Sequence, residues 1–500
     1  MERRKADDEA FARRLAKETN ERESEDALRE IEREHFDGES GETYVVIERK
    51  YTMASRAFVS ERKVEVVDAA RTAKPIVDTD DTMTPMTWKT LLTQYDAELG
   101  EVRVEMLVNG MFPTIWKRRR ARGERNVVAQ ELGEWLWGVV LHDESRDVAC
   151  AARDALLFAL GFDTRIGSLY TSGLRRFDYA RREVYANYDA PAWTPTAKEV
   201  CDALVALGAR DDREGAKNSS DPPPEPEGNV RVRHELFLVL QVITAFCDNA
   251  FARGKVAFEG GQGEHARLLQ ILASIAIDPR TRALDVVVEQ TAAALMASIP
   301  DKQWMIFKAQ AVKRLAALMD DDEYGVKVYV ARWLPCATDR EVDLRDAISA
   351  GLIMTLQHHI ARADGKKLTP IKLTDKLASE IAQSDAASIL KRRSAAAAQL
   401  ADARVDAKLD PPEVWRLIYV MDLVDIVLNG GVVIEGEELS PEGGLELFMR
   451  FLSKKLPRTF RPSLSALKTK MWAVKTRYER IGDVTRAAIK GAKEAMHQVE

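Results

Sequence analysis

Two runs of basic side chains are the groups in this sequence that could most clearly act on another molecule. One follows Ile115-Trp116, and the other lies within residues 454–493, where lysine and arginine far outnumber the acids. Such side chains bind phosphate groups, and the release of counterions supplies much of the binding free energy. The candidate nucleic-acid contacts are Lys117, Arg118, Arg119, Arg120, Lys454, Lys455, Arg458, Arg461, Lys468 and Lys475.

The spacing of the second run suits a phosphate backbone. Arg461, Lys468 and Lys475 recur at seven-residue intervals, so they would share one side of a helix. No recognition-helix motif accompanies them, and binding would therefore be independent of base sequence. An alternative stays open for both runs, in which the cations pair with acids of the same chain or of an acidic partner protein.

Signatures of catalysis, cofactor binding and metal binding are absent from the sequence. It has no GxxxxGK[ST] loop, no HExxH motif and no GxSxG elbow. His358 and His359 are adjacent on a helical stretch, so they point about 100° apart and do not share one metal ion. We expect a non-enzymatic protein with no catalytic residues, metal, cofactor or small-molecule substrate, although distant residues can still assemble a site.

Composition indicates a soluble and mostly helical protein. The 500 residues are 46% hydrophobic and 31% charged, and the net charge of −6 argues against uniform coating of nucleic acid. The four cysteines lie far apart and fit free thiols in a reducing compartment. No apolar run reaches the roughly 20 residues of a membrane span, and the N-terminus does not resemble a secretory signal. We therefore expect an intracellular protein without membrane contact.

The elements that would position these groups fall into three regions. Residues 1–83 are charged, with apolar residues too sparse for a packed face, and we expect a largely disordered tail. Helical periodicity fills residues 84–430, apart from a proline-rich linker insertion at 211–230. Residues 431–500 are expected to form a basic helical extension.

Within the helical region, helices of roughly 12–20 residues alternate with short polar links. One begins at Trp193-Thr194-Pro195-Thr196, where a capping residue precedes a proline, and stops at Gly208. An alanine-rich helix is expected near 373–407 and an apolar one from Val414 to Leu428. No repeat of fixed period occurs, so we predict an all-α fold, an irregular HEAT/armadillo-like stack of antiparallel helix pairs.

Four large side chains are expected in the core of this stack: Trp135, Leu136, Trp193 and Leu344. Each lies on an apolar face at helical spacing. Trp135→Ala is therefore expected to lower the melting temperature and to impair partner binding only through instability.

Four stretches within about residues 84–360 follow, in order, the pattern of one known family. They are Leu132-Gly133-Glu134-Trp135-Leu136-Trp137 with His142-Asp143, Trp193-Thr194-Pro195-Thr196 with Leu207-Gly208-Ala209, Leu272 to Pro279 with Ile299-Pro300 and Trp304, and Trp333-Leu334-Pro335 with Arg340, Leu344, Arg345 and Ala347. Together they resemble the CANIN domain family, the helical domain of the regulatory loader subunit of the SMC five–six chromosome-maintenance complex. Two positions depart from the family pattern: Trp137 replaces a Phe, and Asp346 replaces an Arg.

This resemblance implies a subunit that pairs with a second non-SMC element, docks on the SMC ATPase core and helps to recruit the ring to damaged DNA. On that basis we expect a nuclear regulatory or loading subunit that acts in DNA repair and chromosome maintenance. Composition and periodicity alone predict only a helical interaction protein. A general HEAT-like adaptor in transport or cytoskeletal assembly is therefore the alternative. An enzyme, the third hypothesis, would show a deep pocket with polar groups of strongly perturbed pKa.

Overall fold

Helices make up most of the structure, a computed structural model that describes residues 97–121, 130–160, 193–209, 234–318, 324–356, 373–401, 403–405, 409, 411–428, 443–455 and 464–480. In chain order they are α5 (Ala97–Val108), α6 (Met111–Ala121), α7 (Gln130–His142), α8 (Arg146–Ala159), α11 (Ala197–Ala206), α12 (His234–Ala252), α13 (Gln262–Ile277), the 3-10 helix η3 (Pro279–Leu284), α14 (Asp285–Ser298), α15 (Asp301–Ala316), α16 (Tyr324–Trp333), α17 (Asp339–Leu356), α18 (Asp375–Ala382), α19 (Ala386–Ala401), α20 (Pro411–Val427) and α21 (Gly444–Lys454). Residues 464–480 are also helical, and no described residue belongs to a strand. The all-α prediction is confirmed.

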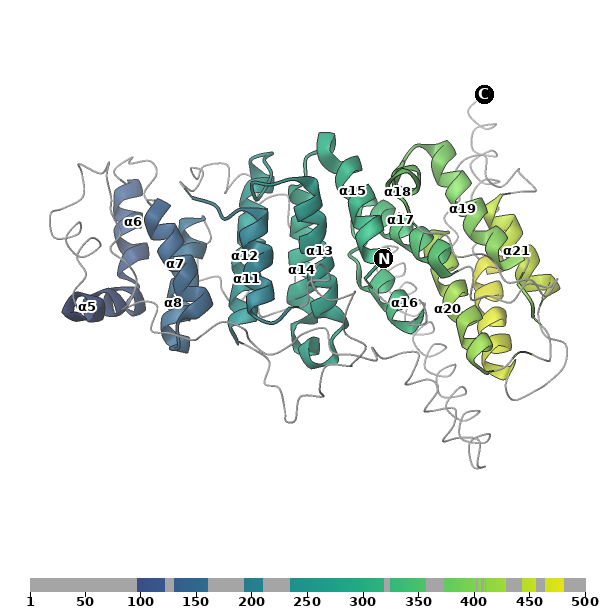
Figure 1. The fold of residues 1–500 in the computed structure, drawn as a ribbon, viewed down its shortest axis with the longest axis horizontal. Helices are drawn as coiled ribbons and strands as arrows, with labels where there is room; N and C mark the ends of the chain where they lie inside the picture. The colour runs from purple at the N-terminus through teal and green to yellow at the C-terminus, as the bar shows by residue number, and fades with distance from the viewer. Residues whose placement is uncertain are drawn as a thin grey trace, which may run out of the picture.

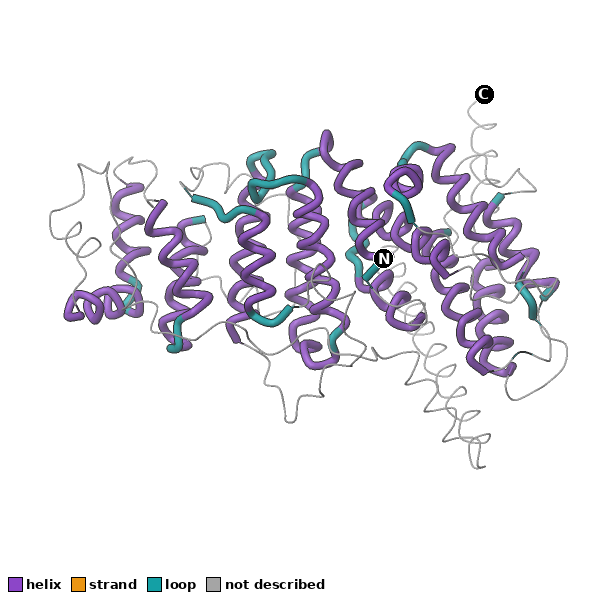
Figure 2. The backbone as a smooth tube through the Cα atoms, in the orientation of Figure 1, coloured by secondary structure: helices purple, strands orange, loops and turns teal. Residues whose placement is uncertain are grey.

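The helices stand side by side along the long axis of the molecule, in an order that follows the sequence (Figure 1). Neighbours in sequence pack together, as α7 does with α8 and α13 with α14. Several helices also contact one further along, as α12 does with α14 and α13 with α15. Figure 2 shows that the described loops are short and lie at the helix ends. This pattern is that of a stack of antiparallel helices, as predicted.

Helix α12 lies largely inside the stack. Its stretch Glu235–Ala252 is long and apolar enough to cross a membrane by length and composition, and 78% of that stretch is buried inside the protein. Contacts with α7, α8, α11 and α14 surround it. Its Thr244 hydroxyl donates to the Leu240 carbonyl at 2.8 Å, which satisfies a buried polar group. Burial in the core therefore accounts for the apolar composition of α12.

A capping box fixes the start of α11. The Thr196 hydroxyl accepts from the Glu199 backbone N–H at 3.2 Å, and the Glu199 carboxylate accepts from the Thr196 N–H at 2.7 Å. The cap is therefore Thr196 rather than Thr194, the residue before the proline. The helix ends near Gly208, as predicted, because the φ of 101° at this residue lies in the left-handed region that glycine tolerates.

The alanine-rich region forms two helices, so the prediction of one helix over 373–407 is wrong. Helix α18 ends at Ala382 and α19 begins at Ala386. Between them, the Asp385 carboxylate accepts from the Ser388 backbone N–H at 2.9 Å and caps α19. This side-chain hydrogen bond offers the backbone an alternative to a continuous helix, which explains the interruption.

The hydrophobic core continues from α5 to the helix at 464–480. In that last helix Leu467, Met471 and Tyr478 belong to the same buried cluster as the earlier helices, and α21 packs on α19. The core therefore extends beyond residue 430, after which the sequence predicts a basic helical extension. The predicted tail at 1–83 and the linker at 211–230 lie outside the described residues.

Three of the four predicted core residues are buried in the stack. Trp135 is 7% exposed, and Leu136 and Leu344 have no exposed surface. The fourth, Trp193, is only partly buried, and its surroundings are described below.

Replacing Leu344 by alanine should lower the free energy of unfolding by about 2–5 kcal/mol, because a buried leucine leaves a cavity when truncated. Ile306→Ala on α15 is the matched control, since the Ile306 side chain is 59% exposed and its loss should change stability by less than about 0.5 kcal/mol. Urea unfolding followed by circular dichroism measures both variants. Equal losses would contradict the core position of Leu344.

Candidate functional site

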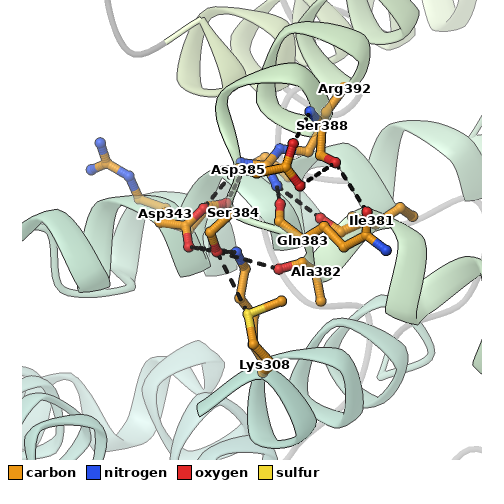
Figure 3. Close-up of polar contacts among 12 residues, drawn as sticks. Lys308, Asp343, Ile381, Ala382, Gln383, Ser384, Asp385, Ser388 and Arg392 are labelled. Atoms are coloured by element: carbon orange, nitrogen blue, oxygen red, sulfur yellow. Dashed lines mark hydrogen bonds and ion pairs between the residues drawn. The ribbon is translucent and has the colours of Figure 1, made fainter. Parts of the chain in front are cut away.

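A cluster of polar side chains joins α15, α17 and the connection between α18 and α19 (Figure 3). Lys308 on α15 has a fully buried side chain, and its Nζ donates to Asp343 Oδ2 at 2.5 Å and to Ser384 Oγ at 2.8 Å. Ser384 Oγ also lies 2.6 Å from Asp343 Oδ2. One carboxylate of α17 therefore receives both the lysine and the serine.

Arg392 of α19 completes the cluster from the other side. Its Nη2 donates to Asp343 Oδ1 at 3.1 Å, and its Nη1 donates to the carbonyls of Ile381 at 2.8 Å and Gln383 at 3.2 Å. These carbonyls lie at the C-terminal end of α18, where backbone acceptors lack helical partners and the helix dipole favours a cation. The guanidinium thus satisfies the end of α18 and links it to α17.

Burial shifts the pKa of two side chains in and beside this cluster. Burial lowers the pKa of Lys308 to about 8, against the opposing effect of Asp343. Burial likewise raises the pKa of Asp346, one turn further along α17, to about 7, although Arg392, Arg345 and Arg393 oppose the shift. In both cases the loss of water around the charged form outweighs the attraction of the neighbouring charges.

A lysine of lowered pKa beside a serine hydroxyl can serve as base and nucleophile in acyl transfer. That chemistry also needs a cavity at the hydroxyl and donors for the oxyanion. Ser384 lies on an exposed connection, and its hydroxyl is held by Asp343. The hydrogen bonds and ion pairs described above join α15, α17, α18 and α19, so the cluster serves as a link between these helices.

A groove of about 460 Å³ lies between α7 and α11. Among its lining residues are Glu134, Trp137, Trp193, Glu199, Asp202 and Leu207. Helix α7 packs mainly on α8, and α11 packs mainly on α13; both also contact α12, and the groove lies between them. Three- and four-residue spacing puts the lining residues of each helix on one face.

The indole of Trp193 forms part of the groove. Its ring centroid lies 6.5 Å from that of Trp137, with the planes tilted by 53°. On its other side the ring meets Phe246 of α12 edge-on, at 5.9 Å. A Cβ at Gly133 would lie only 2.8 Å from Trp193 Cε3, so the glycine lets the indole rest on α7. Trp193 is therefore half-buried: it packs on α7 and α12 and lines the groove, so the prediction of a core residue holds only in part.

Three acidic side chains and one histidine, His142, line the groove. Glu134 comes from α7, and Glu199 and Asp202 come from α11. Arg267 of α13 donates to Asp202 Oδ1 at 3.1 Å and to Glu264 Oε2 at 3.2 Å, so two carboxylates share this buried guanidinium. The charge of Asp202 is thus only partly compensated, and the groove can accept a cation.

The basic residues predicted to contact nucleic acid are not gathered into one described patch. Lys117, Arg118, Arg119 and Arg120 lie on α6, and their side chains fall outside the described part of the structure. Arg458 and Arg461 also fall outside it. Of the remaining candidates, Lys454 is exposed, and Lys455, Lys468 and Lys475 are half-buried.

Several cations of the helix at 464–480 pair with acids of the chain itself. Lys470 Nζ lies 2.7 Å from Asp422 Oδ1, and Lys475 Nζ lies 3.5 Å from Glu479 Oε1. Arg477 is bonded to Asp425 of α20. For these residues the contacts follow the alternative of pairing within the chain. Lys475 is also one of the predicted members of the phosphate stripe, whose contact with nucleic acid stays a prediction.

Neither the polar cluster nor the groove was predicted from the sequence. The sequence does contain a signal for the groove. Glu134 lies one helical turn before Trp137, and Glu199 lies one helical turn before Asp202. The sequence contains no signal for the cluster, because Lys308 and Ser384 are 76 residues apart.

Comparison with known proteins adds no relative, since no family model matches the chain and no curated protein matches it significantly. The resemblance to the CANIN family thus rests on the four short stretches and stays a prediction. Within the described residues, no group of three or more His, Cys, Asp or Glu side chains is placed to hold a metal ion.

Asp346→Asn should make stability less dependent on pH. Because the folded pKa of about 7 exceeds the ordinary pKa of 3.8, the folded chain keeps a proton that the unfolded chain loses between about pH 4 and 7. Stability therefore falls as pH rises through this window, by about 1.4 kcal/mol per unit of pKa difference. Urea unfolding at pH 4.5 and 7.5 should show a smaller loss in the variant than in the parent. An unchanged loss would contradict the assignment, and exposed Asp375→Asn is the matched control.

Lys454→Gln combined with Lys468→Gln should weaken binding to duplex DNA without altering stability. For each phosphate group that is no longer neutralised, the log–log dependence of affinity on salt should also become shallower by about 0.9. Fluorescence anisotropy at two salt concentrations measures both effects, and Lys198→Gln on α11 is a control with the same change of charge on an exposed residue. Affinity and salt dependence equal to those of the parent would leave the basic segment with contacts inside the protein or with an acidic partner.

Proposed function

We propose that this chain is a non-enzymatic protein-interaction scaffold, and specifically a regulatory or loading subunit of the SMC five–six complex that acts in the nucleus in DNA repair. The observation that carries the scaffold proposal is the long stack of helices with one continuous core. Such a stack offers extended surfaces on which several partners can bind at once. Its partners would be the second non-SMC element and the SMC ATPase core, with DNA contact independent of base sequence.

The resemblance to the CANIN family supports the choice of complex. Two of the stretches that carry it, 132–143 and 193–209, contribute to neighbouring walls of the groove between α7 and α11. Two segments that are far apart in the sequence thus meet at one surface feature. A partner that all members of the family bind would favour the same residues at such a surface. A general adaptor in transport or cytoskeletal assembly would have the same fold and is the second candidate.

Affinity purification of the tagged chain from its native cell should recover SMC ATPases and a second non-SMC element. Chromatin association should increase after DNA damage, whereas a steady cytoplasmic or vesicular distribution would favour the adaptor. Repeated purifications that recover neither partner would contradict the proposal. Trp135→Ala is a useful companion variant, because a buried tryptophan should lose partners only together with a lower Tm. Selective loss of partners at normal Tm would instead make Trp135 an interface residue.

A further inference from the structure

We propose that the groove between α7 and α11 binds an arginine or lysine side chain presented by a basic segment of a partner protein. This proposal deepens the scaffold function and depends on it only because the ligand belongs to another protein. The evidence for it is the chemistry of the residues that line the groove.

The half-buried indole of Trp193 provides the aromatic surface for a cation. Trp137 lies beside it, with ring centroids 6.5 Å apart and planes tilted by 53°, but it is only 7% exposed and mainly supports the position of Trp193. The negative face of an indole attracts a guanidinium or an ammonium group. Phe246 and Gly133 fix the position of Trp193 from behind, and therefore little ordering of this ring is needed when a ligand binds.

Carboxylates from both α7 and α11 line the groove. Glu134 lies one turn before Trp137 on α7, while Glu199 and Asp202 lie one turn apart on α11. The hydrogen bonds that Glu199 accepts from Thr196 come from a neutral backbone N–H and a neutral hydroxyl, so they do not neutralise its charge. Charge complementarity therefore favours a cationic ligand and opposes an anionic one.

A cation already bound by this wall shows which geometry the wall accepts. The Arg267 guanidinium reaches Asp202 Oδ1 from the side of α13. A partner arginine would meet an equivalent carboxylate from the open side, with a charge-assisted hydrogen bond. The volume of about 460 Å³ suits a side chain with its adjoining backbone, since it lies toward the small end of the roughly 300–1,000 Å³ typical of ligand pockets.

The test uses the full chain labelled with 5-fluorotryptophan and observed by fluorine NMR. Trp137→Phe and Trp193→Phe variants assign the two groove resonances. Peptides of sequence Gly-Ser-X-Ser-Gly are titrated, with X as arginine, lysine or glutamine. The arginine and lysine peptides should shift both groove resonances and bind about tenfold more tightly than the glutamine peptide. The resonance of Trp472, which is 61% exposed on the helix at 464–480, should not move.

A matched pair of carboxylate variants locates the binding. Glu134→Gln should weaken the arginine peptide about threefold to tenfold, whereas Glu144→Gln, on an exposed residue of the α7–α8 link outside the groove lining, should leave it unchanged. Both variants should keep the parent Tm, which excludes unfolding as the cause.

Three outcomes would overturn the proposal. One is the absence of any shift at Trp137 and Trp193, and another is equal binding of the glutamine peptide. The third is occupation by the chain itself. In that case, without peptide, the two resonances would depend on protein concentration or would move on replacing Arg175, Arg176, Arg181 and Arg182 by glutamine. Peptide binding is measured without SMC proteins, so a failed purification and a failed titration contradict different proposals.

Discussion

Helix α12 needs cover on almost every side, and its neighbours are arranged to provide it. Leu238, Val239, Leu240, Val242 and Ile243 have no exposed surface, although consecutive residues point in different directions around the helix. Each such side chain contributes about 1.5–3 kcal/mol when it is buried. One helix cannot cover all of them, and α7, α8, α11 and α14 therefore close around α12 from both directions of the chain. The groove lies at the edge of this arrangement, where α7 packs mainly on α8, α11 packs mainly on α13, and both also contact α12.

The polar cluster imposes a second constraint, on the C-terminal half of the stack. A buried ammonium group without a partner is costly, and removal of one member of a buried ion pair typically costs about 3–5 kcal/mol. Lys308 therefore requires Asp343, and the same carboxylate also receives Ser384 and Arg392. Ser384 and Arg392 reach it only because the chain breaks its helix at 383–385. The direction of α19, and of α21 which packs on it, depends on that turn.

The features that could be predicted from the sequence are those with a local cause. Helical periodicity identified Trp135, Leu136 and Leu344 as buried, and the stop at Gly208 followed from the backbone freedom of glycine. The break between α18 and α19 could not be predicted in the same way, since alanine-rich sequence favours a continuous helix and the partners of Ser384 are distant in the chain. The setting of Trp193 was missed for a related reason. Its spacing shows an apolar residue beside a helix, but whether another element covers its remaining surface is decided by tertiary packing.

Tertiary packing also decides which charged side chains are paired within the chain, and in this respect the two charged regions of the protein differ. The sequence alone leaves open whether the basic segment after residue 454 binds phosphate groups or pairs with acids. In the structure, Asp422, only 6% exposed on its side chain, lies between Lys470 and Arg332, and Asp425 holds Arg477. Lys470 and Arg477 therefore attach the last helix to α20. The carboxylates of the groove are compensated differently. Asp202 shares one guanidinium with Glu264, and the donors that Thr196 offers to Glu199 are neutral. A net charge that remains beside aromatic surface in an open groove has its strongest available interaction with an ion of opposite sign from outside the chain.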